Sequence, residues 1–264
     1  MKKATDPAQA EESSGAADYI NQGLFHTIKS RNIKAAIAAF TKAITMDRAS
    51  SNAFFYRGNC FFKNGLYGTA IADYTTAYSL DPIDVRIYKA REWAVYYQKW
   101  AEDHRNHLEI MTLVNCAFDA EWDQENDLAF GYFKKALKLC SDNAFIYYQR
   151  GLVYHHLNEM EKAIKDFNAA IKYAPLIASV YYDRANVYHL KDMYDKAVKD
   201  YTKAIKLYPA FSDAVCNRGV SYFMQNEFDK AAADFKGARR INPNDSLAKS
   251  NLGKTLTQRK KIAV

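Results

Sequence analysis

Apolar side chains along this chain follow the three- and four-residue spacing of amphipathic helices, and the pattern returns with a period of about 34 residues. Pro175, Pro209 and Pro243 are spaced by this period, and Pro82 has the same place in an earlier period. We number each repeat so that its proline is position 32. Four repeats then start at Ser51, Ala144, Ala178 and Ser212. The pattern therefore predicts a series of helical hairpins, each ended by a proline.

Five positions recur in phase through these repeats. Position 8 is small, at Gly58, Gly151, Ala185 and Gly219. Aromatic residues occupy positions 11 and 24, at Phe61, Tyr154, Tyr188, Tyr222, Tyr74, Phe167, Tyr201 and Phe235. Alanine occupies positions 20 and 27, at Ala70, Ala163, Ala197, Ala231, Ala77, Ala170, Ala204 and Ala238. Small residues let two helix backbones approach and the aromatics fill the space around them, so each repeat is expected to be a pair of antiparallel helices.

The segment AFIYYQRGLVYHHLNEMEKAIKDFNAAIKYAP and its counterparts one and two periods later resemble the tetratricopeptide repeat family. The resemblance covers about residues 17 to 245. It departs from the family at position 4, where the family often has tryptophan and this chain has Phe54, Tyr147, Tyr181 and Val215. The resemblance implies an all-α fold: a right-handed α-solenoid of stacked antiparallel hairpins, in which the first helices line a concave groove.

The repeats differ in quality, which predicts a division of the chain. Residues 17–83 are expected to form two hairpins. The first is degenerate, with Leu24, Thr27 and Arg48 in place of the small, aromatic and proline residues. Three regular hairpins are expected over 144–245. A capping helix and a basic tail should follow over 246–264, and residues 1–16 are expected to be a disordered N-terminal tail.

Residues 84–143 are expected to be an irregular, tryptophan-rich junction. Counting one period forward from Ser51 and one period back from Ala144 gives starts at Val85 and Ile110, which lie closer together than a full period. Nine residues are therefore missing, and we expect helices near 84–100, 103–120 and 126–140 with a bend or break in the superhelix. Trp93, Trp100 and Trp122 are interpreted as filling the altered space between these helices; the alternative is a binding role for one of them.

Charged residues also follow the period. Position 7 is arginine and position 23 is aspartate in all four repeats, at Arg57, Arg150, Arg184, Arg218, Asp73, Asp166, Asp200 and Asp234. A planar guanidinium suits a carboxylate that accepts two hydrogen bonds, so we expect each arginine to pair with an aspartate, within a hairpin or across a hairpin boundary. The alternative is eight solvated charges.

Composition adds little to this picture. The net charge is +7, but the lysines are spread over helix exteriors and no nucleic-acid motif accompanies them. The four cysteines show no CxxC spacing, and no stretch has the roughly 18 apolar residues of a membrane span. No apolar segment follows Lys2 and Lys3, so no secretory signal is expected. These features predict a cytoplasmic protein in a reducing compartment.

No motif of catalysis or metal binding was found, so we expect no enzyme activity, no cofactor and no metal. His155 and His189 occupy position 12 of adjacent repeats, where they would lie on the order of 10 Å apart, too far to share a zinc ion with bonds of about 2 Å. The acidic run DAEWDQEND has Gln124 and Phe130 where a calcium loop needs glycine and glutamate. We interpret it as an acidic turn between helices.

In proteins similar to this one, the groove is lined by positions 2, 5, 9, 12 and 13 of the first helices. The candidate peptide-binding residues are Phe55, Asn59, Lys89, Tyr148, His155, Tyr182, Asn186, His189 and Asn217. Aromatic rings supply buried area and asparagine can bond a peptide backbone.

Family members that act as co-chaperones hold a C-terminal carboxylate with two lysines, an arginine and two asparagines. This chain supplies Asn186 and Asn217, but it has Tyr182 at the first lysine position and Leu247 and Asn251 at the last two cation positions. A carboxylate without these cations would be buried unpaired, so no carboxylate clamp is expected.

The sequence thus predicts a non-catalytic scaffold or adaptor that binds a partner peptide or protein in its groove, as part of a larger complex. The alternative is a regulatory or targeting subunit of an enzyme complex, such as a phosphatase, a transferase or a chaperone machinery.

Overall fold

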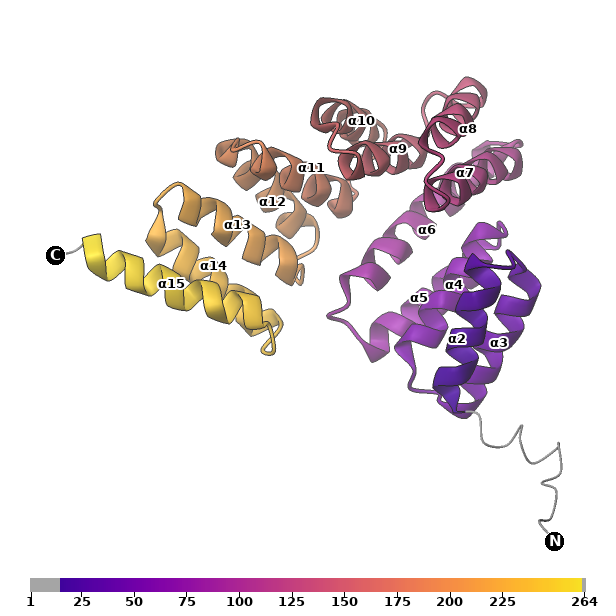
Figure 1. Ribbon diagram of the computed structural model, residues 1–264, viewed down its shortest axis with the longest axis horizontal. Coiled ribbons are helices and arrows are strands. Elements are labelled where there is room, and N and C mark those ends of the chain that lie inside the picture. Colours follow the sequence, from indigo (N-terminus) through magenta and orange to yellow (C-terminus); the bar gives the residue numbers. More distant parts are fainter. Residues whose placement is uncertain (1–14, 263–264) are drawn as a thin grey trace, which may run out of the picture. The chain divides into compact units, whose positions relative to one another are not determined.

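The computed structural model describes residues 15–262, and every regular element in that range is an α-helix (Figure 1). The helices are α2 (Ala16–Ile28), α3 (Ile33–Met46), α4 (Ser51–Lys63), α5 (Tyr67–Leu80), α6 (Val85–Asp103), α7 (His107–Trp122), α8 (Asn126–Leu139), α9 (Ala144–His156), α10 (Met160–Tyr173), α11 (Ala178–Leu190), α12 (Tyr194–Leu207), α13 (Ser212–Met224), α14 (Phe228–Ile241) and α15 (Ser246–Ile262). The predicted all-α fold of sequential hairpins is confirmed.

The helices pair in the order in which they occur along the chain. Hairpins form from α2 and α3, α4 and α5, α7 and α8, α9 and α10, α11 and α12, and α13 and α14, while α6 packs on α5 and α15 packs on α14. The chain divides into two compact bodies, residues 1–105 and 106–264. Within each body, consecutive hairpins pack side by side, as the period of the sequence predicts.

The prolines mark the turns between hairpins. Pro82, Pro175, Pro209 and Pro243 each stand two positions after the last residue of a second helix. The residue before a proline is disfavoured in helical conformation, and the intervening residues Tyr208 and Asn242 are indeed extended. Helices α5, α10, α12 and α14 therefore end where their prolines predict.

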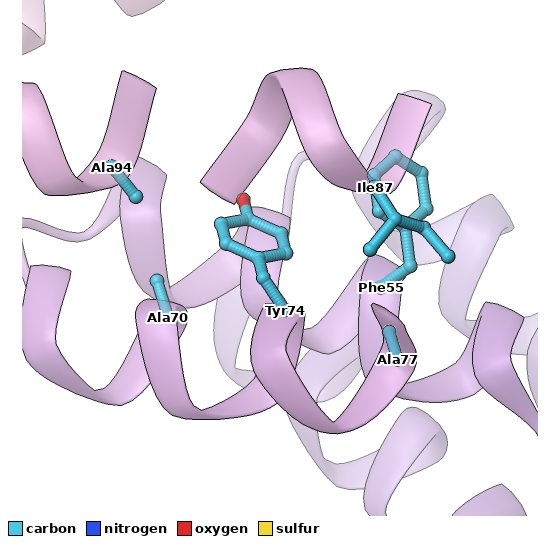
Figure 2. Close-up of a cluster of buried hydrophobic side chains, with 6 residues drawn as sticks. All are labelled: Phe55, Ala70, Tyr74, Ala77, Ile87 and Ala94. Atoms are coloured by element: carbon cyan, nitrogen blue, oxygen red, sulfur yellow. The ribbon is translucent and has the colours of Figure 1, made fainter. Parts of the chain in front are cut away.

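The glycines of position 8, Gly58, Gly151 and Gly219, lie against the aromatic residue of position 24 in the same hairpin. A Cβ atom added to Gly58 would stand 2.7 Å from the Tyr74 ring, and one added to Gly151 would stand 2.8 Å from the Phe167 ring. Figure 2 shows the resulting core in the N-terminal body, where Ala70, Tyr74 and Ala77 of α5 lie between side chains of α4 and α6. Glycine at position 8 is what lets the ring approach the first helix so closely.

The first hairpin has the same contact with a shifted register. Gly23 faces Phe40 as Gly58 faces Tyr74, but the separation along the chain is longer by one residue. The expectation that Leu24 replaces the small residue was therefore wrong, because one extra residue in the turn moves that role to Gly23. The predicted N-terminal tail, 1–16, lies outside the described residues except for Gly15 and Ala16, and Ala16 already begins α2.

Every turn within a described hairpin contains one residue in left-handed conformation, always two positions before the second helix. These residues are Arg31, Gly65, Gln124, Asn158, Asp192 and Asn226. A single left-handed residue ends the first helix and reverses the chain, which glycine, asparagine and aspartate tolerate best. The acidic run 119–127 spans the end of α7, the turn at 123–125 and the start of α8, so the interpretation of the run as a turn holds only for its central residues.

The segment 84–143 contains the three helices that were expected, α6, α7 and α8, and the boundary between the two bodies falls inside it. Helix α6 begins at Val85 and packs on α5 as the first helix of any repeat packs on the preceding hairpin. Helix α7 then begins a new hairpin, so the repeat that starts at Val85 has no second helix. The absent second helix, offset in part by the length of α6 (19 residues against 13 in α4) and by the start of α7 at His107, accounts for the missing residues. The bend or break of the superhelix stays a prediction.

The three tryptophans of this segment have different environments. Trp93 and Trp100 of α6 are buried, and the Trp100 ring lies 5.0 Å from that of Tyr97. Trp122, the last residue of α7, is 62% exposed. The interpretation that all three fill space between helices was therefore wrong for Trp122, because it stands at the end of a first helix where no second helix covers it.

Among the described helices, none is both long enough and apolar enough to cross a membrane. All four cysteines are free, and three of them, Cys60, Cys140 and Cys216, are buried. Burial raises the pKa of Cys216 to about 12 and that of Cys140 to about 11, so these thiols are protonated at neutral pH.

Candidate functional site

The arginines of position 7 and the aspartates of position 23 form one ion pair in each regular hairpin. Both Nε and Nη2 of the arginine donate to the carboxylate, at 2.6–2.8 Å, in the pairs Arg57–Asp73, Arg150–Asp166, Arg184–Asp200 and Arg218–Asp234. The aspartates are buried. Each pair lies within a hairpin and joins its first helix to its second with a geometry that only arginine can supply.

Three of the four arginines also reach the preceding hairpin, which the sequence did not indicate. Nη1 of Arg184 donates to Asn168 Oδ1 at 2.5 Å, and Nη1 of Arg218 donates to Thr202 Oγ1 at 3.0 Å. Arg57 makes the same contact with Thr41 at 3.3 Å. The acceptor is always position 25 of the preceding repeat, so each of these arginines holds three helices together and has an architectural role.

The candidate groove residues lie on the first helices of both bodies. Phe55 and Asn59 are on α4 and Lys89 is on α6 of the N-terminal body; the others are on α9, α11 and α13 of the C-terminal body. Phe55 and Tyr148 are only 8% and 4% exposed, which favours a packing role for these two. The partly exposed members are Asn59, Lys89, His155, Tyr182, Asn186, His189 and Asn217.

Helices α11 and α13 bring three of these residues together. Asn217 Nδ2 donates to Asn186 Oδ1 at 3.2 Å and to the Tyr182 hydroxyl at 3.3 Å. Asn186 Oδ1 also accepts from the Tyr201 hydroxyl at 2.6 Å. Burial raises the pKa of Tyr182, so its hydroxyl keeps its proton and can both donate and accept. We call Tyr182, Asn186, Tyr201 and Asn217 the amide network.

Two histidines of the candidate set lie on the first helices α9 and α11. His189 Nδ1 lies 2.9 Å from Ser221 Oγ of α13, and His155 is on α9. Burial lowers the pKa of both histidines below the usual range, so both rings are neutral at neutral pH. Tyr148 donates to buried Asp183 at 2.8 Å, which ties α9 to α11 beneath this surface.

The asparagines of position 9 have a structural partner that the sequence pattern could have revealed. Asn59 accepts from Tyr74 at 2.8 Å, in the same way as Asn186 accepts from Tyr201. Repeats with tyrosine at position 24 have asparagine at position 9, and repeats with phenylalanine there have an apolar residue: Asn59 with Tyr74 and Asn186 with Tyr201, against Leu152 with Phe167 and Val220 with Phe235. The co-occurrence satisfies the buried hydroxyl.

This pairing predicts the outcome of a double-mutant cycle. Tyr201→Phe removes one donor to Asn186 and should lower the free energy of unfolding by about 1 kcal/mol. Adding Asn186→Leu recreates the Leu152–Phe167 pair and should recover part of the loss, although it also removes an acceptor of Asn217. Urea unfolding of the wild type, the two single variants and the double variant measures the coupling. Strict additivity would contradict the pairing.

The C-terminal end of the surface contains a small hollow between α13, α14 and α15. Val220, Phe223, Asn251 and Lys254 are among the residues that line it. Lys254 is a cation at position 9 of α15 when that helix is counted as a further first helix, and this position is not one of the cation positions of the carboxylate clamp. Leu247 is exposed and carries no charge where that clamp would have a cation.

Among solved structures, the chain is similar to the Cut9–Hcn1 hetero-tetramer of the APC/C, with a TM-score of 0.52 and 19% identity over 92% of this chain and 43% of that chain. It is also similar to YrrB, described as a TPR protein with an unusual peptide-binding site, with a TM-score of 0.45 and 20% identity over 81% of this chain and 98% of that chain. At 19% identity the likeness to the Cut9–Hcn1 chain shows the fold alone, and this chain spans less than half of that chain.

The family is shown by the sequence. No curated protein matches the chain. Sequence models of the tetratricopeptide repeat match residues 28–84, 144–175, 178–211 and 212–245, which together make up more than half of the chain. These matches fall on the hairpins described above, and the chain therefore belongs to the tetratricopeptide repeat family.

Proposed function

We propose that the chain is a non-catalytic interaction scaffold, and that it binds a segment of a partner protein on the first-helix surface of α9, α11 and α13. The observation that carries the proposal is the amide network. It places amides and hydroxyls from neighbouring first helices on one partly exposed surface. Such groups can exchange hydrogen bonds with a peptide backbone.

The surroundings of the network support a peptide as the ligand. The Tyr182 ring lies 4.6 Å from the Phe211 ring, so it is held in place and can offer a rigid apolar face. His155 and His189 add polar groups on the first helices α9 and α11, and burial keeps both rings uncharged at neutral pH. A surface of neutral donors and acceptors suits the backbone of an internal segment better than a charged chain terminus.

The residues on α4 and α6 provide a second, separate candidate surface in the N-terminal body. Asn59 and Lys89 are partly exposed there, next to buried Phe55. The Phe55 ring is covered by the Arg86 guanidinium, whose carbon lies 5.5 Å from the ring centre. Together, the two surfaces would let one chain bring two segments together, as expected of an adaptor.

Peptide selection on the full chain tests the proposal. Peptides enriched from a random phage-displayed library should bind with micromolar Kd, and Asn217→Ala should weaken them at least tenfold. His189→Ala should weaken them as well, because it removes a polar group from the same surface. Asn64→Ala is the matched control, since it removes an exposed amide from the end of α4 and should have no effect. Selected peptides that bind both site variants as tightly as the wild type would refute the proposal.

A further inference from the structure

The second helices of the C-terminal body have a strongly basic outer face. On α8, α10, α12 and α14, positions 22, 25, 26 and 29 of the repeat point away from the buried residues of positions 20, 23, 24 and 27. These sixteen positions contain ten cations and no carboxylate. Helices α8 and α12 supply three each, Lys134, Lys135, Lys138, Lys199, Lys203 and Lys206. We call the ten cations at these positions the basic face.

The basic face is not neutralised by carboxylates of the same helices. The aspartates of position 23 are buried, and each accepts two hydrogen bonds from the arginine of its own hairpin. The carboxylates of position 18 lie at the opposite end of these helices, where Glu161 pairs with Lys191 and Asp229 pairs with Arg259. No ion pair formed by residues 15–262 includes any of the ten cations. Their charge is therefore available to a ligand.

Helix termination alone does not explain this face. The helix dipole favours a cation in the last turn, which accounts for position 29. Lys165 and Lys199 are at position 22, about two turns earlier, where the dipole has little effect. The N-terminal body also differs, because α5 has no charged residue at the four positions and α3 has only Lys42. The basic face is thus a feature of one body and not of the repeat itself.

Successive second helices are joined beside the basic face by the arginines of position 7. Nη1 of Arg184 donates to Asn168 at position 25 of α10, while its Nε donates to Asp200 of α12 at 2.6 Å. Arg218 joins α12 to α14 in the same way. On each helix, cations three or four positions apart are about 4.5–6 Å apart along the axis. The cations therefore form adjacent rows on a rigid support.

The neutral positions of the face indicate which kind of anion it suits. They hold only small or uncharged polar residues, Gly131, Asn168, Ala169, Thr202, Ala233 and Gly237. None offers a ring on which a nucleic-acid base can stack, or a large apolar group that can enter a bilayer. Leu139 and Tyr173 are exposed at the ends of α8 and α10, outside the face.

The type of cation supports the same choice. Nine of the ten are lysine and one is Arg240, whereas bidentate binding of phosphate groups favours arginine. A lysine ammonium pairs with a single carboxylate as a point charge, and it needs no particular orientation of that group. Rows of lysine therefore suit a run of carboxylates on a polypeptide better than a nucleic acid or a membrane.

We propose that the basic face is a docking surface for an acidic segment of another protein, rich in aspartate and glutamate, that lies across α8, α10, α12 and α14. Complementary charge speeds association and selects the partner by its sign. The face is formed by second helices, whereas the amide network includes Asn186 and Asn217 of the first helices α11 and α13. The proposal therefore adds a second binding surface to the function proposed above.

A peptide of alternating glutamate and serine, about 16 residues and roughly 50 Å long when extended, is the probe. Fluorescence anisotropy of the labelled peptide with the full chain at low ionic strength should give a micromolar Kd. The Kd should rise as NaCl is added, because exposed charges are screened. The counterpart with lysine in place of glutamate should not bind. Single-stranded oligothymidine and vesicles containing phosphatidylserine should displace the glutamate peptide at least tenfold less effectively per anionic group.

Variants of matched charge locate the binding surface. The triple variant Lys199→Gln, Lys203→Gln and Lys206→Gln should weaken the glutamate peptide at least tenfold and reduce its salt dependence. The same change of the three α8 lysines should act alike. The control triple, Lys29→Gln, Lys34→Gln and Lys99→Gln, removes the same charge from exposed positions of the N-terminal body and should change Kd less than twofold. Circular dichroism checks that each variant is folded.

Four outcomes would overturn the proposal. Absence of binding at low ionic strength would show that the face does not hold an acidic segment, and equal weakening by the control triple would show that binding follows net charge alone. Loss of binding in Asn217→Ala would assign the peptide to the amide network. Better displacement by oligothymidine or by the vesicles would assign the face to nucleic acid or to a membrane. None of the four contradicts the proposed function of the amide network, which the selected peptides test separately.

Discussion

Asp200→Ala should lower the free energy of unfolding of the C-terminal body by about 3 kcal/mol. The carboxylate accepts two hydrogen bonds from Arg184, whose side chain is only 16% exposed. Without it the guanidinium keeps Asn168 and the rings of Tyr181 and Tyr188, none of which carries a compensating charge. The expected loss in the free energy of unfolding is at the lower end of the range for breaking a buried ion pair, because the arginine retains some contact with water. Urea unfolding followed by circular dichroism measures it.

Two further variants test the origin of this loss: one removes both charges of the buried pair, and the other breaks an exposed ion pair. Arg184→Met with Asp200→Leu removes both charges and should recover most of the stability, since a buried ion pair is seldom worth more than apolar packing. Glu159→Ala breaks the exposed pair with Lys162 and should cost roughly 0–1 kcal/mol. If Asp200→Ala were as mild as Glu159→Ala, the architectural role of these arginines would be refuted.

Phe167→Ala should cost about 3–5 kcal/mol, because it empties the contact between α9 and α10. The Phe167 ring is fully buried and lies so close to Gly151 that a Cβ there would stand 2.8 Å from it. Neither helix can close the gap without losing the Arg150–Asp166 pair, whose hydrogen bonds are 2.7 Å long. The cavity should therefore persist.

Amide hydrogen exchange locates the helices that lose stability in Phe167→Ala. Each hairpin contacts mainly its neighbours, so protection should fall in α7 to α12 and change little in the N-terminal body. Leu139→Ala, at an exposed position at the end of α8, is the control and should leave protection unchanged. A uniform loss of protection through both bodies would contradict the near-neighbour character of the stack.

The sequence predicted most of the residues of the candidate site, but it did not predict which of them are buried and which remain accessible. The periodic positions put Asn186 and Asn217 on first helices, and the structure joins them through one hydrogen bond. Asn186 also accepts a hydrogen bond from Tyr201. The co-occurrence of asparagine at position 9 and tyrosine at position 24 is present in the sequence, but only the structure shows that these two side chains are partners. The burial of Phe55 and Tyr148 could not be read, because a ring at position 5 has the same sequence signal whether it packs inward or faces a ligand.

What the sequence by itself determined is the local unit. Glycine or alanine at position 8, aromatics at position 24 and proline at position 32 encode a hairpin, because helix approach, ring packing and helix termination are local effects. The tertiary structure decided which groups remain accessible. Trp122 is exposed and Trp93 is buried, and Arg184 reaches the preceding hairpin, because these outcomes depend on where neighbouring helices lie. The sequence thus determines each hairpin, whereas the accessible surfaces are determined by how the hairpins stack.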